Sequence, residues 1–232
     1  MGNTKDLLHQ ALEQHQAGNL TDAEAIYLKI YKENPQLVDV LFLLGTLYLQ
    51  SGNPEASVTF LQKAITLKPD HVEAHNNLGT VFQNCGNFEK AVESYKRALN
   101  LAPDYAEAFY NLGSIFNKQH KFDLALEHYK QAISLSPDDY EAHLNIGNTF
   151  KELGKFKEAE KSYRRSATLK PDYAIAYSRL GNILQEQGKF EESVKSLKRA
   201  IVLDPTNADI HNNLGTTLTK QGNLDEAVES YK

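Results

Sequence analysis

The residues whose chemistry stands out in this sequence are asparagines that recur at a fixed interval. The spacing from Asn77 to Asn111 is repeated from Asn111 to Asn145, and Asn213 lies two such spacings beyond Asn145. A carboxamide carries donors and an acceptor together, so it can bind both the N–H and the C=O groups of an extended peptide, whatever the side chains of that peptide are. The pattern therefore predicts a peptide-binding surface. The candidate residues of this surface are Asn76, Asn77, Tyr110, Asn111, Asn145, Asn148, Arg179, Asn182, Asn212 and Asn213.

These asparagines also have a plainer interpretation, in which they only solvate an exposed helix face. Asn is a mediocre helix former, however, and Lys or Glu would serve solubility better at the position that Asn77, Asn111 and Asn145 share. Peptide binding is therefore our working prediction, and solvation of the helix face stays open as the alternative.

Sequence motifs indicate no second kind of chemistry. His71 and His75 are close enough in sequence to share a helix face, but they straddle the expected start of a helix, and no third ligand stands nearby in the sequence. No phosphate-binding glycine loop, nucleophile motif or zinc-binding motif occurs, and the single cysteine, Cys85, cannot form an internal disulfide bond. We therefore expect that the chain is not an enzyme by itself and has no metal site and no cofactor.

Prolines set the period of the chain. Their strict recurrence at the same interval as the asparagines is typical of stacked supersecondary units. The prolines that mark it are Pro35, Pro69, Pro103, Pro137, Pro171 and Pro205. With proline at position 32 of each unit, repeats 1 to 6 span residues 4–37, 38–71, 72–105, 106–139, 140–173 and 174–207, and a partial repeat 7 spans 208–232. The prediction is a single array over residues 1–232, with no room for another domain.

Each repeat is expected to fold as a hairpin of two helices, A and B. Its apolar residues fall at positions 4, 7, 8 and 11 and then at 20, 24 and 27, a helical spacing interrupted by a turn. The chain is therefore predicted to be all-α, with about thirteen helices in antiparallel pairs and no sheet. Glycine at position 8, such as Gly79, favours close approach of the two helices, and tyrosine at position 24, such as Tyr95, is predicted to fill the larger gap between repeats.

The helix ends have their own residue types. A glycine such as Gly86 can take the left-handed conformation that ends helix A, and an asparagine such as Asn87 can cap helix B; His120 replaces this glycine in repeat 4. An aspartate such as Asp138, which follows the period-marking proline, is predicted to start the next helix A.

These residues resemble the tetratricopeptide repeat consensus, and the match recurs along the whole chain. The residues that carry it in repeat 3 are Leu78, Gly79, Phe82, Ala91, Tyr95, Ala98 and Pro103. The resemblance implies a right-handed superhelical solenoid of tetratricopeptide helix hairpins. The inner surface of such a solenoid is formed by helix A, which carries the asparagines.

The asparagines at position 6 also resemble the asparagine ladder of O-linked N-acetylglucosamine transferases. Leu43 and Arg179 interrupt the ladder in this chain. The resemblance implies an alternative function, in which the chain is the substrate-recruiting arm of a larger bacterial glycosyltransferase whose catalytic domain lies beyond Lys232. A carboxylate clamp for chaperone tails is disfavoured, because Tyr110, Ser114 and Ile175 occupy positions where that clamp needs other residues.

Composition indicates which partners to expect. The net charge is −5 and the charges of both signs are interspersed, so no basic field exists to bind nucleic acid. The longest apolar run, residues 37–49, is shorter than a membrane span and contains Asp39, and no signal peptide is evident at the N-terminus. We expect a cytoplasmic protein-interaction scaffold whose partner is a protein or peptide, without nucleic acid or membrane.

The partial repeat 7 stops soon after Tyr231, within its helix B. A repeat array needs a polar cap over its last unit, so this end is expected to be apolar and open to end-to-end self-association.

Overall fold

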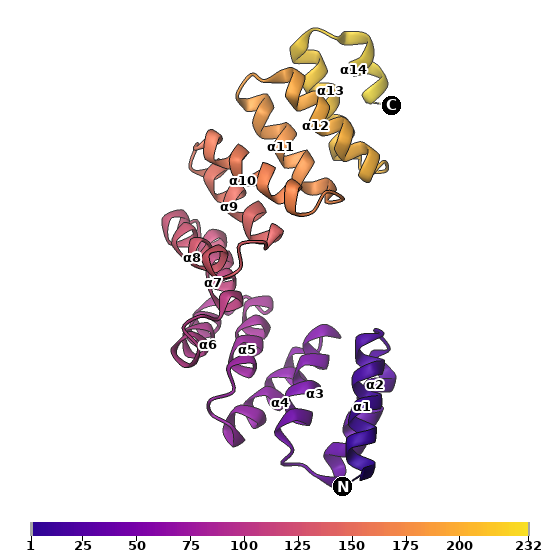
Figure 1. Cartoon of the computed structure of the whole chain (residues 1–232), viewed down its shortest axis with the longest axis vertical. Helices are drawn as coiled ribbons and strands as arrows, with labels where there is room; N and C mark the ends of the chain where they lie inside the picture. The colour runs from indigo at the N-terminus through magenta and orange to yellow at the C-terminus, as the bar shows by residue number, and fades with distance from the viewer. Residues whose placement is uncertain (1, 232) are drawn as a thin grey trace. The chain divides into compact units, whose positions relative to one another are not determined.

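The computed structural model describes residues 2–231, and these residues form fourteen α-helices and no strand (Figure 1). The helices are α1 (Gly2–Gln16), α2 (Leu20–Glu33), α3 (Val38–Gln50), α4 (Pro54–Leu67), α5 (Val72–Asn84), α6 (Phe88–Leu101), α7 (Ala106–Lys118), α8 (Phe122–Leu135), α9 (Tyr140–Glu152), α10 (Phe156–Leu169), α11 (Ala174–Glu186), α12 (Phe190–Leu203), α13 (Ala208–Gln221) and α14 (Leu224–Ser230). The all-α prediction is confirmed. The predicted number of helices was lower because the partial helix B of repeat 7 still forms the seven-residue α14.

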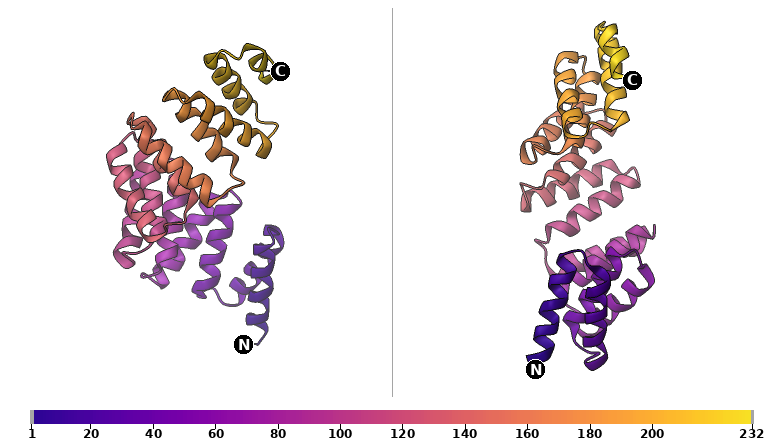
Figure 2. Two further views of the ribbon diagram at one scale, coloured as in Figure 1. Left: turned by 45° about the horizontal axis from the view of Figure 1, so that its top comes forward. Right: turned by 90° about the vertical axis from the view of Figure 1, so that its right-hand side faces the viewer.

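The chain divides into two compact units, residues 1–115 and 116–232, with the division inside α7. In unit 1, α1 packs on α2, α3 on α4 and α5 on α6; in unit 2, α9 packs on α10, α11 on α12 and α13 on α14. These pairs are the expected hairpins, and Figure 2 shows the same pairs from two further sides. The prediction of a single array stays a prediction.

The turn inside each hairpin follows one backbone scheme. Gly86 has a φ of +75°, and Asn87 N–H donates to Phe82 C=O at 2.8 Å, a bond that spans the turn. Such a left-handed residue with a long-range N–H bond closes the end of an α-helix. Asn87 Oδ1 also accepts from Lys90 N–H at 3.2 Å, so the predicted cap of helix B is confirmed in repeat 3.

His120 takes the same left-handed conformation without being glycine. Its φ is +57°, and it is the one non-glycine residue with positive φ among residues 2–231. The neighbouring Lys121 N–H donates to Phe116 C=O at 2.8 Å, the same hydrogen bond that closes the turn in repeat 3. The backbone of the turn is therefore unchanged, and His120 is held in a conformation that is strained for an L-residue.

We expect His120→Gly to raise the free energy of unfolding by about 1 kcal/mol, because it removes the steric cost of an L-residue in the left-handed region. Denaturant titration of both proteins measures the change. Gly154→His, which puts a side chain in the equivalent turn of repeat 5 (φ +69°), is the matched control and should lower stability. A destabilised His120→Gly would show that the imidazole contributes more than its backbone costs.

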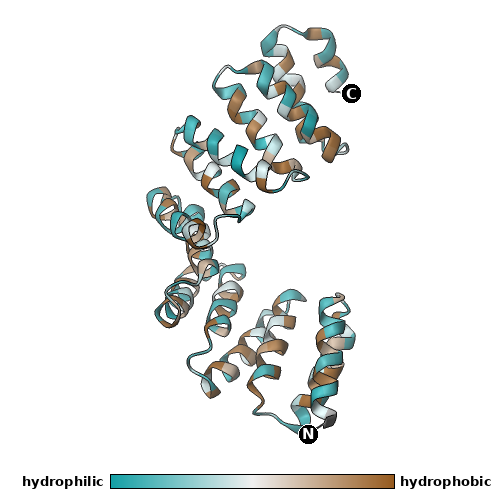
Figure 3. Cartoon of the chain, viewed as in Figure 1, coloured by the Kyte–Doolittle hydropathy of each residue, from teal (hydrophilic) through white to brown (hydrophobic). Residues whose placement is uncertain are grey.

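In repeats 2, 3, 5, 6 and 7 the glycine at position 8 lies against the side chain at position 24. A Cβ at Gly79 would lie 2.7 Å from Tyr95 Cε1, and a Cβ at Gly147 would lie 2.5 Å from Tyr163 Cε1. The tyrosine ring therefore packs on the glycine of its own repeat. Because glycine has no side chain, there is room for this ring beside helix A. Tyr163 also packs in one cluster with Leu180 and Ile183 of the next repeat, so the predicted filling of the gap between repeats is confirmed for this tyrosine, and the contact with its own glycine comes in addition. Hydrophobic and hydrophilic residues alternate along the helices that form these hairpins (Figure 3).

Repeats 2 and 6 use a different pair of core residues, which was not predicted from the sequence. Their position 24 is Leu61 or Leu197, and their position 20 is serine where other repeats have alanine. The buried Ser57 Oγ donates to Gly45 C=O at 2.7 Å, and Ser193 Oγ donates to Gly181 C=O at 2.7 Å. Each repeat thus combines either Ala with Tyr or Ser with Leu, and the serine hydroxyl is satisfied inside its own hairpin. Repeat 1, which places Ala11 beside Tyr27, departs at position 8 instead.

Helix A begins one residue later than predicted. Asp139 Oδ1 accepts from Glu141 N–H and Ala142 N–H at 3.0 Å, whereas Asp138 binds Arg165 at 2.9 Å. The prediction that Asp138 caps the helix is therefore wrong by one position.

Candidate functional site

Unit 2 brings four of the predicted peptide-binding residues into one cleft. Arg179 and Asn182 lie on α11, and Asn212 and Asn213 lie on the next A helix, α13. The cleft has a volume of about 370 Å³. We call it the α11/α13 cleft. Its other lining residues are Ala174, Ile175, Ser178, Asp204, Asn207, Asp209 and Ile210.

The charges of this cleft are of both signs. Arg179 is exposed and makes no ion pair among residues 2–231, while Asp209 is exposed on the opposite wall. Asp204 accepts a hydrogen bond from Asn207 Nδ2 at 2.9 Å, so one carboxylate oxygen is already occupied. Ile175 keeps 46% of its surface exposed at the cleft and supplies an apolar contact. The cleft can therefore bind carbonyl, amide and charged groups beside a small apolar side chain.

Two more predicted residues, Asn145 and Asn148, lie on α9. Tyr163 Oη donates to Asn148 Oδ1 at 3.0 Å, and Asn148 Nδ2 lies 3.4 Å from Asn145 Oδ1. Burial raises the pKa of Tyr163 far above its usual value, against the opposing positive charge of Arg179. The hydroxyl therefore remains a donor at physiological pH and fixes the orientation of the Asn148 amide.

The tyrosine at position 24 makes an equivalent contact in two further repeats. Tyr95 Oη lies 3.2 Å from Thr80 Oγ1, and Tyr231 Oη lies 3.4 Å from Thr216 Oγ1. Each pair has the same separation in sequence as Tyr163 and Asn148, so the tyrosine at position 24 holds the side chain at position 9. Burial raises the pKa of Tyr95 to about 12, which keeps this hydroxyl protonated as well.

In unit 1 the predicted asparagines bond to neighbouring repeats. Asn76 is completely buried; its Nδ2 donates to Glu107 Oε1 at 2.9 Å, and its Oδ1 accepts from Asn111 Nδ2 at 3.2 Å. Asn77 Nδ2 donates to Thr46 Oγ1 of the preceding repeat at 3.0 Å. Asn76 therefore cannot contact a peptide directly in this structure, which corrects its prediction as a surface residue. Tyr110 is half-buried beside them on α7.

A further set of amides between repeats was not predicted from the sequence. Asn117 Nδ2 donates to Thr149 Oγ1 at 2.6 Å, and Gln185 Oε1 lies 2.7 Å from Thr217 Oγ1. Both threonines are completely buried at position 10, where repeats 2, 3, 4 and 6 have Val, Ile or Leu. Threonine at position 10 together with an amide at position 12 of the preceding repeat is the signal that could have identified this pairing.

Three histidines at position 4 bond to the backbone. His75 Nε2 donates to Pro69 C=O at 3.0 Å, and His143 and His211 make the equivalent bond to Pro137 and Pro205 at 3.0 Å. Because a carbonyl oxygen only accepts, Nε2 must carry the proton in all three. His71 Nδ1 lies 3.1 Å from Glu73 Oε2, and no group of three metal-binding side chains occurs in residues 2–231. Within the same range, none of the helices is long and apolar enough to cross a membrane.

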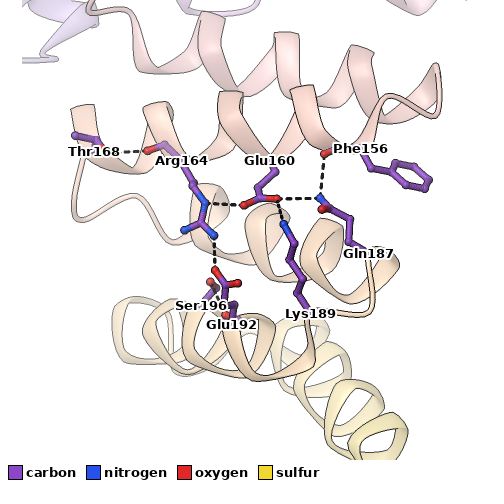
Figure 4. A network of polar contacts seen from close by, with 8 residues as sticks. All are labelled: Phe156, Glu160, Arg164, Thr168, Gln187, Lys189, Glu192 and Ser196. Atoms are coloured by element: carbon purple, nitrogen blue, oxygen red, sulfur yellow. Dashed lines mark hydrogen bonds and ion pairs between the residues drawn. The ribbon is translucent and has the colours of Figure 1, made fainter.

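The B helices of unit 2 carry a network of charges (Figure 4). Glu160 on α10 accepts from Lys189 Nζ at 2.7 Å, from Arg164 Nε at 2.9 Å and from Gln187 Nε2 at 3.1 Å. Burial alone would raise the pKa of Glu160, but these hydrogen bonds outweigh it and hold the pKa below its usual value. Arg164 also donates to Glu192 on α12 at 2.6 Å, so the network links repeats 5 and 6.

Comparison with known proteins identifies the family. A model of the cilia and flagella-associated protein 70 C-terminal domain matches residues 71–232, and a tetratricopeptide repeat model matches residues 14–78. The chain belongs to the tetratricopeptide repeat family. This membership confirms the resemblance in the repeat consensus. No match was found among curated proteins.

Several solved structures are similar to this chain. A crystal structure of MamA protein is 27% identical with a TM-score of 0.61, covering 75% of this chain and 96% of that one. Pseudomonas aeruginosa pilF is 22% identical with a TM-score of 0.75, covering 83% and 88%. YrrB, described as a TPR protein with an unusual peptide-binding site, is 21% identical with a TM-score of 0.63, covering 84% and 97%. The last two likenesses show the fold alone.

Proposed function

We propose that this tetratricopeptide repeat protein is a protein-interaction scaffold that binds an extended segment of a partner protein in the α11/α13 cleft. The observation that carries the proposal is the convergence of Arg179, Asn182, Asn212 and Asn213 around one space of about 370 Å³. The peptide-binding site in the description of YrrB supports a scaffold role in general terms. It supports none of the residues named here.

Each group in the cleft has a part in this binding. Asn182 and Asn213, both half-buried, present amides to the main chain of the segment, so recognition tolerates different sequences. Arg179 binds a carbonyl or carboxylate of the segment, and Asp209 favours a neutral or basic residue near it. Ile175 packs against a small apolar side chain.

The other asparagines serve this function indirectly. Asn76, Asn77 and Asn111 hold repeats together through bonds to Glu107 and Thr46 and to one another. The ladder in unit 1 therefore gives no support to the alternative of a glycosyltransferase arm, and that alternative stays a prediction.

Arg179→Ala should lower the affinity for a bound peptide about tenfold, and Asn213→Ala about fivefold, since a net hydrogen bond contributes about 1 kcal/mol and a charged one more. The probe is a pool of fluorescein-labelled dodecapeptides of varied sequence without Pro, measured by fluorescence polarisation. Arg199→Ala removes an exposed arginine from α12 and is the matched control. Equal affinities for wild type and Arg179→Ala, with unchanged circular dichroism, would refute the proposed site.

A further inference from the structure

A second cleft lies in unit 1, on the side of the B helices. Its floor is α5, through His75, Leu78 and Phe82, and one wall is α6, through Lys90 and Arg97. The volume is about 610 Å³. We call it the basic cleft. None of its lining residues belongs to the predicted peptide-binding set.

The cations of the basic cleft are not neutralised. Lys90, Lys96 and Arg97 are all exposed, and none of them forms an ion pair among residues 2–231. Glu93 is the acidic residue that lines the cleft, so the cleft carries three positive charges against one negative charge. Lys90 Nζ lies 5.4 Å from the centre of the Phe82 ring, which draws the ammonium over the apolar floor. This local positive charge stands on a chain whose net charge is −5.

The same place in other repeats shows what the basic cleft lacks. Positions 25 and 19 of consecutive B helices form an ion pair in unit 2: Arg164 with Glu192 at 2.6 Å (Figure 4), and Lys198 with Glu226 at 3.1 Å. Both pairs have the same separation in sequence, and the residues at these positions in the basic cleft are Gln62 and Lys90. At this junction between consecutive B helices, Lys90 therefore has the uncharged Gln62 at the partner position and no carboxylate.

The cleft of repeat 7 makes the contrast direct. It lies at the same repeat positions, with His211 and Leu214 in place of His75 and Leu78, and has a volume of about 830 Å³. Glu226 stands there in place of Lys90. The two clefts share two of the three floor positions, and at position 19 they carry opposite charges, Lys90 in repeat 3 and Glu226 in repeat 7.

We propose that the basic cleft binds an acidic segment of a partner protein, with a carboxylate between Lys90 and Arg97 and a leucine or phenylalanine on the floor of Leu78 and Phe82. The incoming carboxylate neutralises Lys90, the residue at position 19, which in repeats 6 and 7 is neutralised by an ion pair within the chain itself. The ligand is a peptide rather than a phosphate group, because a phosphate would leave the apolar side chains of Leu78 and Phe82 exposed to water. This site is separate from the α11/α13 cleft, so the chain can hold two segments at once.

The probe is a fluorescein-labelled peptide, Gly-Ser-Glu-Asp-Leu-Glu-Phe-Asp-Glu-Leu-Gly-Ser, and its neutral control replaces each Glu by Gln and each Asp by Asn. Fluorescence polarisation with the full chain should show at least tenfold tighter binding of the acidic peptide. Its affinity should fall as the salt concentration rises, because exposed charges are screened.

Three variants locate the binding. Lys90→Glu with Arg97→Glu should weaken binding at least tenfold, whereas Lys157→Glu with Lys195→Glu changes the net charge equally at exposed positions in unit 2 and should change the affinity less than twofold. Gln62→Glu places a carboxylate near Lys90, an arrangement like that of Arg164 and Glu192 with the two charges exchanged, and should weaken binding about threefold without touching a cation.

The proposal is overturned if the two paired charge reversals weaken binding equally, or if the neutral peptide binds as tightly as the acidic one. Competition by inorganic phosphate or by a single-stranded oligonucleotide at concentrations that match the peptide would also overturn it, since that result would indicate a general anion site. Arg179→Ala must leave the acidic peptide's affinity unchanged; this keeps a failure of the α11/α13 cleft distinct from a failure of the basic cleft.

Discussion

Tyr163→Ala should lower the free energy of unfolding by about 3–5 kcal/mol, the cost of truncating a large aromatic residue in a packed core. Tyr163 has no exposed surface and packs in one cluster with Leu144 of its own repeat and with Leu180 and Ile183 of the next. The substitution opens a cavity at the junction of repeats 5 and 6, which neighbouring side chains cannot fill without shifting two hairpins. Denaturant titration followed by circular dichroism measures the loss.

Two further variants show how much of this loss comes from the hydroxyl of Tyr163 and how much depends on burial of the ring. Tyr163→Phe keeps the ring and removes only the bond to Asn148, so we expect a loss of about 1 kcal/mol. Tyr231→Ala truncates the residue at the same position of repeat 7, where 52% of the surface is exposed, and should cost less than half as much as Tyr163→Ala. A Tyr163→Ala loss below about 1 kcal/mol would mean that the cluster is not a stabilising core.

The hairpins and their turns could be predicted because their causes are local. A glycine at the left-handed position of a turn and a proline that lacks an N–H act on the backbone beside them, and both recur at a fixed spacing. Even the exception could be identified, since His120 interrupts the series of glycines and is the residue found in the strained conformation. Asp139 shows the limit: two aspartates follow Pro137, and the residue types alone do not say which one caps α9.

The direction of each side chain across a hairpin could not be predicted. The period of the repeats says that Gly147 and Tyr163 recur together, but not that the ring lies on its own glycine. The exchange of Ala with Tyr for Ser with Leu was visible in the sequence, and its reason, the bond from Ser57 to Gly45, needed coordinates.

The candidate sites show the same division. Periodicity placed Asn76 and Asn213 on one helix face, yet Asn76 is buried between repeats and Asn213 lines a cleft. Neighbouring helices decide between these outcomes, and a helix pattern contains no information about them. The basic cleft was missed because its cations lie on an exposed helix face, where a solvated charge and a binding charge look alike in sequence.

The contact between positions 8 and 24 leads to the second large effect that we expect. Gly147→Ala should cost about 2–3 kcal/mol, because its Cβ would lie 2.5 Å from Cε1 and 2.7 Å from Cδ1 of Tyr163. Tyr163 has no exposed surface and packs in one cluster with Leu180 and Ile183 of the next repeat, so a shift of its ring disturbs that cluster. In the Tyr163→Ala background this obstacle is gone.

The same Gly147→Ala change should then raise stability by about 0.5–1 kcal/mol, the ordinary preference for alanine over glycine inside a helix. The sign of the effect therefore depends on the residue at position 24 of the same repeat, and a double-mutant cycle measures the coupling as about 3 kcal/mol. Repeat 1, which has Ala11 opposite Tyr27 in the native sequence, provides the control: Ala11→Gly should lower stability, because that hairpin already accommodates the methyl group beside the ring. If Gly147→Ala costs the same with and without the Tyr163 ring, its cost arises from the backbone of α9, and the glycine at position 8 does not serve to admit the ring.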